Sequence, residues 1–286
     1  MKSLIEVLRE AEKKRVAIGH FNFSTIAQLR AIVSVARKLD KPIVLGLSEG
    51  ERSYFGLKSA VHIVRNLRSE GLPIFLNADH TYNLGGVREA AEAGVDSIIF
   101  DGAKLSYKEN EKKTKQAVKL VKDINPDILI EGELGYIGES SKVLDAIPDK
   151  IDLEHLPTVD QAKYFVDETG VDMLAPAVGN IHGMFGKAKN PRLQIDRIHN
   201  IKDAVKIPLV LHGGSGVTDE DFQAAIKSGI SLIHISTEIR AVWRESLEQI
   251  LKKHPKEIAP YKLMSSVVRD VEGVVEERVR LFSKTS

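Results

Sequence analysis

Eight short apolar runs alternate along this chain with segments of helical length, and few folds accommodate such a rhythm. The apolar runs cover residues 16–21, 43–47, 74–78, 97–100, 128–134, 173–178, 209–211 and 232–235. The helical segments that follow them cover residues 25–39, 57–70, 84–93, 109–123, 159–168, 194–205, 219–227 and 238–253. Strand–helix alternation gives a parallel sheet with right-handed crossovers, and eight repeats is the number at which such a sheet closes. The sequence therefore predicts an α/β fold, the (β/α)8 TIM barrel.

Two further helices are expected outside this repeat. Leu4, Ile5, Leu8 and Ala11 recur at helical spacing with charged residues between them, which predicts an amphipathic helix near the N-terminus. A last helix is expected near residues 262–282. No Pro-, Gly- or Ser-rich linker interrupts the chain, so we expect residues 1–286 to form a single domain.

Composition excludes several classes of protein. The chain has no cysteine, so a metal would have to be held by His, Asp or Glu, and its 43% of hydrophobic residues can fill a core without disulfides. Its net charge of +1 gives no basic footprint for nucleic acid. Its first residues lack the apolar stretch expected of a signal peptide, and the sequence contains no run of about 18 apolar residues. We therefore expect a soluble, cytoplasmic protein that binds neither nucleic acid nor a membrane.

Three histidines follow the third, sixth and seventh apolar runs. His80, His182 and His212 are far apart in sequence, but the loops after the strands of such a barrel converge at one end, where its functional residues gather. Three imidazoles with an open fourth position make a catalytic zinc site. Glycine directly follows His182 and His212 and allows the backbone to approach a ligand closely. The sequence therefore predicts a metal site at this end of the barrel.

Carboxylates stand at two neighbouring strand ends. Asp101 and Glu133 could ligate a metal in an alternative position or order the histidine ligands through hydrogen bonds. A structural salt bridge is an equally open interpretation of both. Glu131 lies two residues before Glu133 and, by strand alternation, faces the same side, so either glutamate could be the donor.

A glycine-rich turn at residues 211–216 leads into the helical segment after the seventh run. Ser236 and Thr237 follow the eighth run, and the loops after the last two strands bind phosphate in many barrels of this type. Backbone N–H groups at a helix N-terminus suit a dianion. These two loops together indicate a phosphate-binding site.

Four motifs carry a resemblance to a known family. They are Asn-Ala-Asp-His at 77–80, Glu-Gly-Glu-Leu-Gly at 131–135, Gly-Asn-Ile-His-Gly at 179–183 and Leu-His-Gly-Gly-Ser-Gly at 211–216. In type and order they resemble the signatures of class II fructose- and tagatose-bisphosphate aldolases. The similarity runs nearly from end to end and includes residues 21–22 and 265–271.

The resemblance implies a zinc-dependent aldolase that reversibly cleaves a ketose bisphosphate, with fructose 1,6-bisphosphate as the expected substrate. Its products would be dihydroxyacetone phosphate and an aldehyde phosphate such as glyceraldehyde 3-phosphate. The resemblance makes Asp79 the catalytic acid and base. It implies that the residues that bind the catalytic zinc or a second divalent ion are His80, His182, His212, Asp101 and Glu133.

The resemblance also places the substrate. It implies contacts to the dihydroxyacetone-phosphate half from Gly183, Gly213, Gly214 and Ser215. The family's Asn-x-x-Thr substrate motif corresponds to His234, Ile235, Ser236 and Thr237. Asn22 and Ser48 match positions that line the same pocket. Members of the family usually hold a monovalent cation (Na⁺ or K⁺) near the phosphate and form homodimers or homotetramers.

Three positions depart from the family pattern. His234 stands where the family usually has Asn, and Asn77 stands where it often has His. In the loop after the fifth strand, Ser141 replaces the Glu that moves the carbon-bound proton in the family. Glu139 could serve from a shifted register, or it could be an ordinary solvated loop residue. Two alternatives therefore stay open. One is an aldolase for another phosphorylated ketose, such as tagatose bisphosphate or a deoxy- or sulfo-sugar phosphate. The other is a barrel that binds a sugar phosphate without turning it over.

Overall fold

The computed structural model describes residues 2–138, 142–146, 151–154, 156–185 and 190–284. Eight parallel strands close into a barrel in the order β1-β10-β9-β7-β5-β4-β3-β2. They are β1 (Ile18–Asn22), β2 (Ile43–Leu47), β3 (Ile74–Thr81), β4 (Ser97–Phe100), β5 (Leu129–Leu134), β7 (Met173–Pro176), β9 (Leu209–Leu211) and β10 (Ile230–Ile235). Each falls on one of the eight predicted runs, so the predicted (β/α)8 barrel is confirmed.

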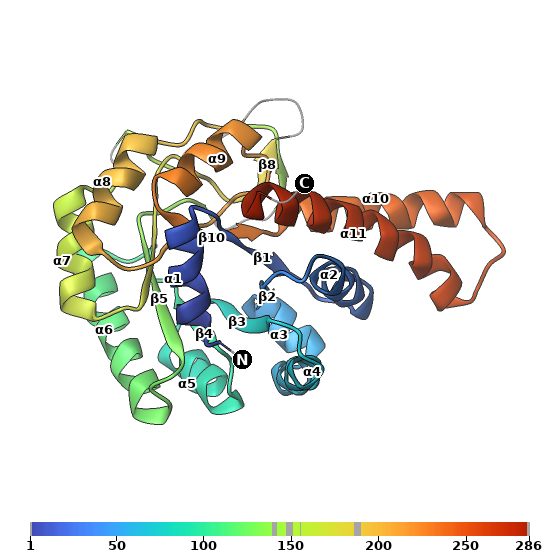
Figure 1. The fold of residues 1–286 in the computed structure, drawn as a ribbon, viewed down its shortest axis with the longest axis horizontal. Coiled ribbons are helices and arrows are strands. Elements are labelled where there is room, and N and C mark those ends of the chain that lie inside the picture. Colours follow the sequence, from blue (N-terminus) through green and yellow to red (C-terminus); the bar gives the residue numbers. More distant parts are fainter. Residues whose placement is uncertain (1, 139–141, 147–150, 155, 186–189, 285–286) are drawn as a thin grey trace.

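Helices surround the barrel (Figure 1). They are α2 (Ile26–Leu39), α4 (Leu57–Ser69), α5 (Leu84–Ala93), α6 (Tyr107–Ile124), α7 (Val159–Thr169), α8 (Ile195–Val205), α9 (Asp219–Lys227) and α10 (Thr237–Lys253). Three short elements were not expected: α3 (Glu49–Phe55), and a two-stranded sheet of β6 (Val143–Leu144) and β8 (Met184–Phe185). They are too short to produce a recognisable hydrophobic period.

The two expected terminal helices are also present. The first, α1 (Leu4–Lys14), lies across the barrel, and the last, α11 (Pro260–Ser283), packs along α10 (Figure 1). Together α10 and α11 extend beyond the barrel as a two-helix arm. α11 has 24 residues, but neither it nor any other described helix is apolar enough to cross a membrane.

The inside of the barrel changes character from one end to the other. Alternate side chains of each strand point inward. Near the strand starts the inward residues form an apolar cluster that includes Ile18, Val44 and Leu232. Leu4 and Leu8 of α1 pack against this cluster and close the amino end of the barrel. Further along the same strands the inward positions become polar but remain buried, as for His20, Asn77, Glu131 and His234. The fold therefore buries its polar groups at the carboxyl ends of the strands.

The third strand is irregular where it carries its predicted functional pair. Its pairing with β4 shifts register between Ala78 and Thr81, and His80 has a φ of 40°, in the left-handed region that residues other than glycine rarely adopt. Neighbouring side chains of a regular strand point to opposite faces, whereas this bulge allows Asp79 and His80 to line the same pocket. The strained backbone of His80 thus lies within the candidate site.

Candidate active site

The three predicted histidine ligands come together at the carboxyl end of the barrel. Potential ligand atoms of His80, His182 and His212 all lie within 4.8 Å of one another. The ring centroid of His80 is 4.9 Å from that of His182 and 5.0 Å from that of His212. His80 stands on β3, His212 follows β9, and His182 lies between β7 and β8, so the closure of the barrel is what brings them together.

Each of these imidazoles is oriented by a hydrogen bond at one ring nitrogen. His182 Nδ1 donates to the carbonyl oxygen of Gly138 at 2.8 Å. His212 Nε2 lies 2.6 Å from Glu131 Oε1, and His80 Nδ1 lies 2.9 Å from Asp101 Oδ2. In every case the other nitrogen is left for a ligand. Metal-binding histidines are characteristically fixed in this way by carboxylates or backbone carbonyls.

Two buried polar atoms at the centre of this group have no hydrogen-bond partner. They are His212 Nδ1 and Glu133 Oε2, which lie 3.4 Å apart. The same carboxylate oxygen is 3.3 Å from His80 Nδ1. An unsatisfied buried polar atom is costly, and several that face one point indicate a missing partner. Three imidazoles and neighbouring carboxylates are a donor set that suits Zn²⁺, so these residues fit a zinc ion.

The charges around the imidazoles favour a cation at the same point. Burial lowers the pKa of His80, but the charge of Asp79 and the contacts with Asp101 and Glu133 raise it well above its usual value. Burial of His212 is likewise outweighed by Glu131, which raises the pKa of His212 to about 10. Burial and the neighbouring His80 lower the pKa of His182 to about 4. Two of the three rings therefore sit in an excess of negative charge.

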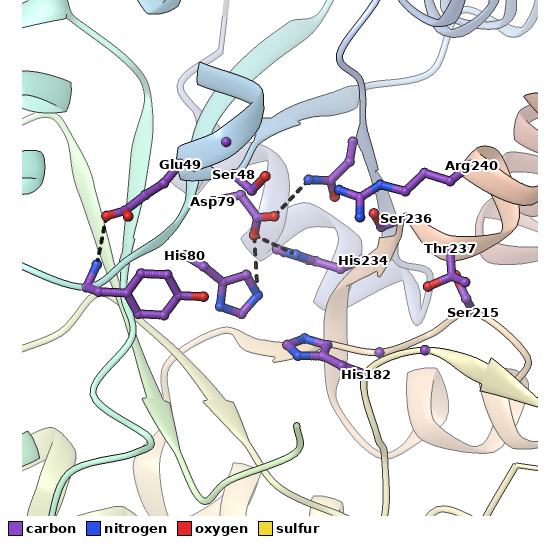
Figure 2. Close-up of a pocket in the computed structure, with 15 residues that line it drawn as sticks. Ser48, Glu49, Asp79, His80, His182, Ser215, His234, Ser236, Thr237 and Arg240 are labelled. Carbon is purple, nitrogen blue, oxygen red and sulfur yellow. Dashed lines mark hydrogen bonds and ion pairs between the residues drawn. The ribbon is translucent and has the colours of Figure 1, made fainter. Parts of the chain in front are cut away.

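Asp79 lies beside this group as an ionised carboxylate. Its Oδ2 accepts a hydrogen bond from Asn22 Nδ2 at 2.8 Å. Its Oδ1 is 3.7 Å from His80 Nε2 and 3.5 Å from His234 Nδ1 and accepts no hydrogen bond (Figure 2). Burial raises the pKa of Asp79, but the charge of His80 and the contact with His234 hold it well below its usual value. One oxygen is therefore held in place while the other remains available to a proton.

Two of the departures from the family pattern touch a common neighbour. His20 stacks on His234 with ring centroids 3.5 Å apart and planes inclined by 5°. Its Nε2 lies 3.2 Å from the side-chain oxygen of Asn77. Gly46 leaves room for this ring, because a Cβ there would lie 2.1 Å from His20 Cε1. His20, expected to be structural, thus links His234 to Asn77 behind the pocket.

The predicted phosphate loops line the other side of the pocket. Gly183, Gly213, Ser215, Ser236 and Thr237 all face it (Figure 2 labels Ser215, Ser236 and Thr237). Ser236 Oγ is buried and has no hydrogen-bond partner. Gly213 has a φ of 60°, and a Cβ there would lie 2.2 Å from the carbonyl oxygen of Ile181, so no larger residue fits this turn. The loops provide a small, polar cradle.

Two of the predicted substrate contacts are placed elsewhere. Ile235 is completely buried in the core between the sheet and the helices, because it follows the inward-facing His234 on the strand. The N–H of Gly214 donates to the carbonyl oxygen of His234 at 3.1 Å, and Gly214 does not line the pocket. Both residues shape the loops from behind. The predicted loop residues Glu139 and Ser141 lie outside the described part of the chain.

The remaining predicted residues lie in or around the pocket. Asn22 and Ser48 line it, whereas Asp101 and Glu133 lie behind His80. The structure adds Glu49, Tyr82 and Arg240 to the lining, and a buried glutamate, Glu51, just outside it. No motif pointed to these residues; a Ser-x-x-Glu capping box at residues 48–51 was the one available signal.

Comparison with known proteins agrees with this geometry. The profile of the family described as "Fructose-bisphosphate aldolase class-II" matches residues 2–286. A fructose-bisphosphate aldolase of Geobacillus stearothermophilus is 30% identical over 291 residues, covering 99% of this chain and 97% of the relative. A sulfofructosephosphate aldolase of Alkalicoccus urumqiensis is 31% identical over 282 residues, covering 96% and 94%. The crystal structure of the YdjI aldolase from Escherichia coli K12 superposes with a TM-score of 0.81 at 26% identity, covering 100% of this chain and 98% of that chain.

Proposed function

The chain belongs to the family of class II fructose-bisphosphate aldolases and is an aldolase, and we propose that its substrate is fructose 1,6-bisphosphate. The reaction would be its reversible cleavage to dihydroxyacetone phosphate and glyceraldehyde 3-phosphate. One observation carries this proposal: three imidazoles surround one point beside an ionised carboxylate, with the phosphate loops across the same pocket. That combination suits a substrate that carries a phosphate and a ketone and whose carbon–carbon bond breaks as a base takes up a hydroxyl proton.

We propose that His80, His182 and His212 hold a catalytic Zn²⁺. When bound, the ion supplies a Lewis acid that polarises the ketone. The unpartnered His212 Nδ1 and the neighbouring Glu133 support this assignment. Asp101 and Glu133 both approach His80 and would serve a second divalent position, and a monovalent cation would lie near the phosphate loops.

Asp79 is proposed to transfer the hydroxyl proton. In the cleavage direction its free Oδ1 accepts the proton of the substrate hydroxyl next to the breaking carbon–carbon bond, and in condensation it returns that proton to the aldehyde oxygen. Asn22 holds the opposite oxygen, so the carboxylate cannot turn away from the pocket. Its lowered pKa keeps it in the base form in which cleavage begins.

The substrate's phosphate is proposed to bind between the loops that follow β9 and β10. Gly213, Ser215, Ser236 and Thr237 face this space, as does Gly183. Thr237 begins α10, so the positive end of that helix dipole favours an anion there. Ser236 Oγ has no other partner and is available to a phosphate oxygen.

A substrate panel tests the proposal. Retro-aldol cleavage would be measured for fructose 1,6-bisphosphate, tagatose 1,6-bisphosphate and sulfofructose 1-phosphate, with the aldehyde product identified in each case. We expect the highest kcat/KM for fructose 1,6-bisphosphate. A preference for the sulfonate would favour the second candidate, a sulfofructosephosphate aldolase, which the relative from Alkalicoccus urumqiensis supports. Cleavage of none of them by the zinc-loaded protein would contradict the proposal.

We also propose that residues 1–286 form one domain and that the protein works in the cytoplasm as a homodimer or homotetramer. The two-helix arm of α10 and α11 supports an oligomer, because large apolar side chains are exposed near its tip. Ile258 and Tyr261 are 89% and 74% exposed. Light scattering on the protein and on the Ile258→Asp variant would test the arm's role: the variant should be monomeric.

A further inference from the structure

A stacked pair of imidazoles lies where the first and last strands of the barrel meet. His20 of β1 and His234 of β10 are direct neighbours in the parallel register of these strands. Their ring centroids are 3.5 Å apart and their planes are inclined by 5°. Adjacent strands lie about 4.8 Å apart, so planar side chains at paired positions on the same face can stack. Both side chains are buried, and only His234 lines the pocket.

The ring of His20 is fixed from behind the pocket. Its Nε2 lies 3.2 Å from the side-chain oxygen of Asn77, whose Nδ2 donates to Ser97 Oγ at 2.7 Å. Burial lowers the pKa of His20 to about 4, so the ring is neutral at pH 7. Because an amide oxygen only accepts, Nε2 carries the proton of this neutral ring. Gly46 of β2 adjoins the ring so closely that a Cβ there would lie 2.1 Å from His20 Cε1.

The ring of His234 is held mainly by this stack. Its Nε2 is buried without a hydrogen-bond partner. Its Nδ1 faces Asp79 Oδ1 at 3.5 Å, which is at the outer limit of a hydrogen bond (Figure 2). The contact with His212 is looser, with centroids 4.4 Å apart and planes inclined by 35°. The stack on His20 is therefore the closest contact that sets the plane of this ring.

The orientation of His234 matters because it faces the reactive oxygen of Asp79. Asn22 holds Oδ2 of that carboxylate, which leaves Oδ1 as the proposed acceptor of the substrate's hydroxyl proton. An N–H at His234 Nδ1 that points at Oδ1 keeps this oxygen directed into the pocket. A turn of the imidazole would remove that N–H, and a misplacement of about 1 Å in such a site can cost about 100-fold in rate.

We propose that His20 is a positioning residue of the aldolase reaction: by stacking on His234 it keeps that imidazole against the proton-accepting oxygen of Asp79. This inference rests on the proposed function and adds to it a residue that lies outside the pocket lining. An asparagine at position 234 would need no such support, because an amide has no ring to stack. His20 and His234 therefore work as one unit.

The test is a double-mutant cycle, measured as cleavage of fructose 1,6-bisphosphate by the zinc-loaded protein. His20→Ala should lower kcat about 10- to 100-fold and change KM less than about twofold, because it misplaces a group that acts in the chemical step. In the His234→Asn background the same substitution should change kcat less than about twofold, because the ring that it positions is gone. A cycle of this kind separates an effect through His234 from a general loss of structure.

Val44→Ala is the matched control. Val44 is completely buried and pairs with His20 in the register of β1 and β2, but it belongs to the apolar cluster at the amino end. Its truncation should lower stability in urea unfolding and leave kcat at the wild-type value.

Gly46→Ala tests the same ring without removing it. The new Cβ must displace His20, so kcat should fall as it does in His20→Ala. Combined with His20→Ala it should cause no further loss, because the ring that it collides with is absent. Proton NMR of the histidine rings gives a readout independent of turnover: stacking should shift a ring proton of His234 upfield in the wild type, and Gly46→Ala should abolish that shift. This variant decides the matter if His234→Asn is inactive.

Three results would overturn the assignment: an equal loss of kcat for His20→Ala in both backgrounds, which indicates a structural role; a raised KM with kcat unchanged; or a wild-type kcat in Gly46→Ala after the His234 signal has moved. A wild-type protein that does not cleave fructose 1,6-bisphosphate would instead overturn the proposed substrate, and this inference with it.

Discussion

The two ends of the barrel are built from the same strands but affect the stability of the fold in opposite directions. At the amino end, inward residues such as Ile18 and Leu232 pack against Leu4 and Leu8 of α1 in a closed apolar cluster. At the carboxyl end, His212 and Glu133 are buried with polar atoms that have no partner. Burial of apolar groups stabilises a fold, whereas buried unpaired polar groups destabilise it.

This difference separates stability from chemistry along each strand. β10 illustrates it: Leu232 fills the apolar cluster, and His234, two residues later, lines the pocket beside Asp79. The amino end is expected to stabilise the folded state, and this stabilisation offsets the cost of burying unpaired polar groups at the carboxyl end. Changes at the carboxyl end should therefore affect turnover and metal affinity, and changes at the amino end should affect stability alone.

The largest effect on the chemical side is expected for Asp79→Asn. The variant keeps the shape of the side chain but cannot accept the hydroxyl proton, so kcat should fall by about 10²- to 10⁴-fold. Zinc content, measured by atomic emission on the purified protein, should be unchanged. Cleavage at the wild-type rate would remove Asp79 from the mechanism, and a simultaneous loss of zinc would show that it acts as a ligand.

Glu131→Gln should have a smaller effect and should act through the metal. Glu131 is completely buried, and its carboxylate orients His212 through the 2.6 Å contact. Loss of such a partner typically weakens metal affinity or activity about 10- to 100-fold. Competition with a fluorescent zinc chelator measures this change directly. An affinity equal to that of the wild type would show that the contact does not orient the imidazole.

On the other side of the comparison, Leu8→Ala should reduce stability without altering the chemistry. Leu8 is completely buried between α1 and the strand starts, and truncation of such a leucine costs about 2–5 kcal/mol. Urea unfolding measures the loss. The kcat and the zinc affinity of the folded variant should match those of the wild type, and a change in either would show that the two ends are coupled.

The smallest effect is expected for Glu6→Gln in the same helix. Hydrogen bonds from the backbone and side chain of Ser3 hold the pKa of Glu6 below its usual value of 4.5. A lowered pKa means that the ionised form stabilises the folded state above about pH 4.5 and that this contribution is lost as the pH falls through the lowered value. The variant should thus have a slightly lower Tm at pH 7, and the difference should shrink as the pH falls below 4.5. A constant difference over this range would contradict the capping role.

Most of the fold could be predicted because buried parallel strands are continuous apolar runs that are easily located. The three histidines could be placed together for a related reason: each lies at or just beyond the carboxyl end of a strand, where the topology of the barrel brings loops together. Contacts between side chains far apart in the sequence could not be predicted. Arg240 and Glu51 are 189 residues apart, and each looks like an ordinary charge on a helix.

Two residues of the predicted substrate motifs, Ile235 and Gly214, do not line the pocket, for a simple physical reason. Ile235 and Gly214 belong to motifs whose other members face the pocket, but alternation along β10 turns Ile235 outward, and the N–H of Gly214 is already bonded to His234. A motif read as a continuous block overlooks this alternation. The period of two along a strand, applied residue by residue, indicates that the Ile235 side chain faces away from the pocket.

We propose that His80, His182 and His212 hold a divalent ion without which the carboxyl end of the barrel has no activity. The most direct test is to titrate zinc into chelator-treated protein while zinc content and aldol cleavage are measured on the same samples. We expect no turnover at zero zinc, a linear rise to full activity at one tightly bound ion per chain, and no rise for His212→Ala. Full activity in protein stripped of divalent metal would contradict it.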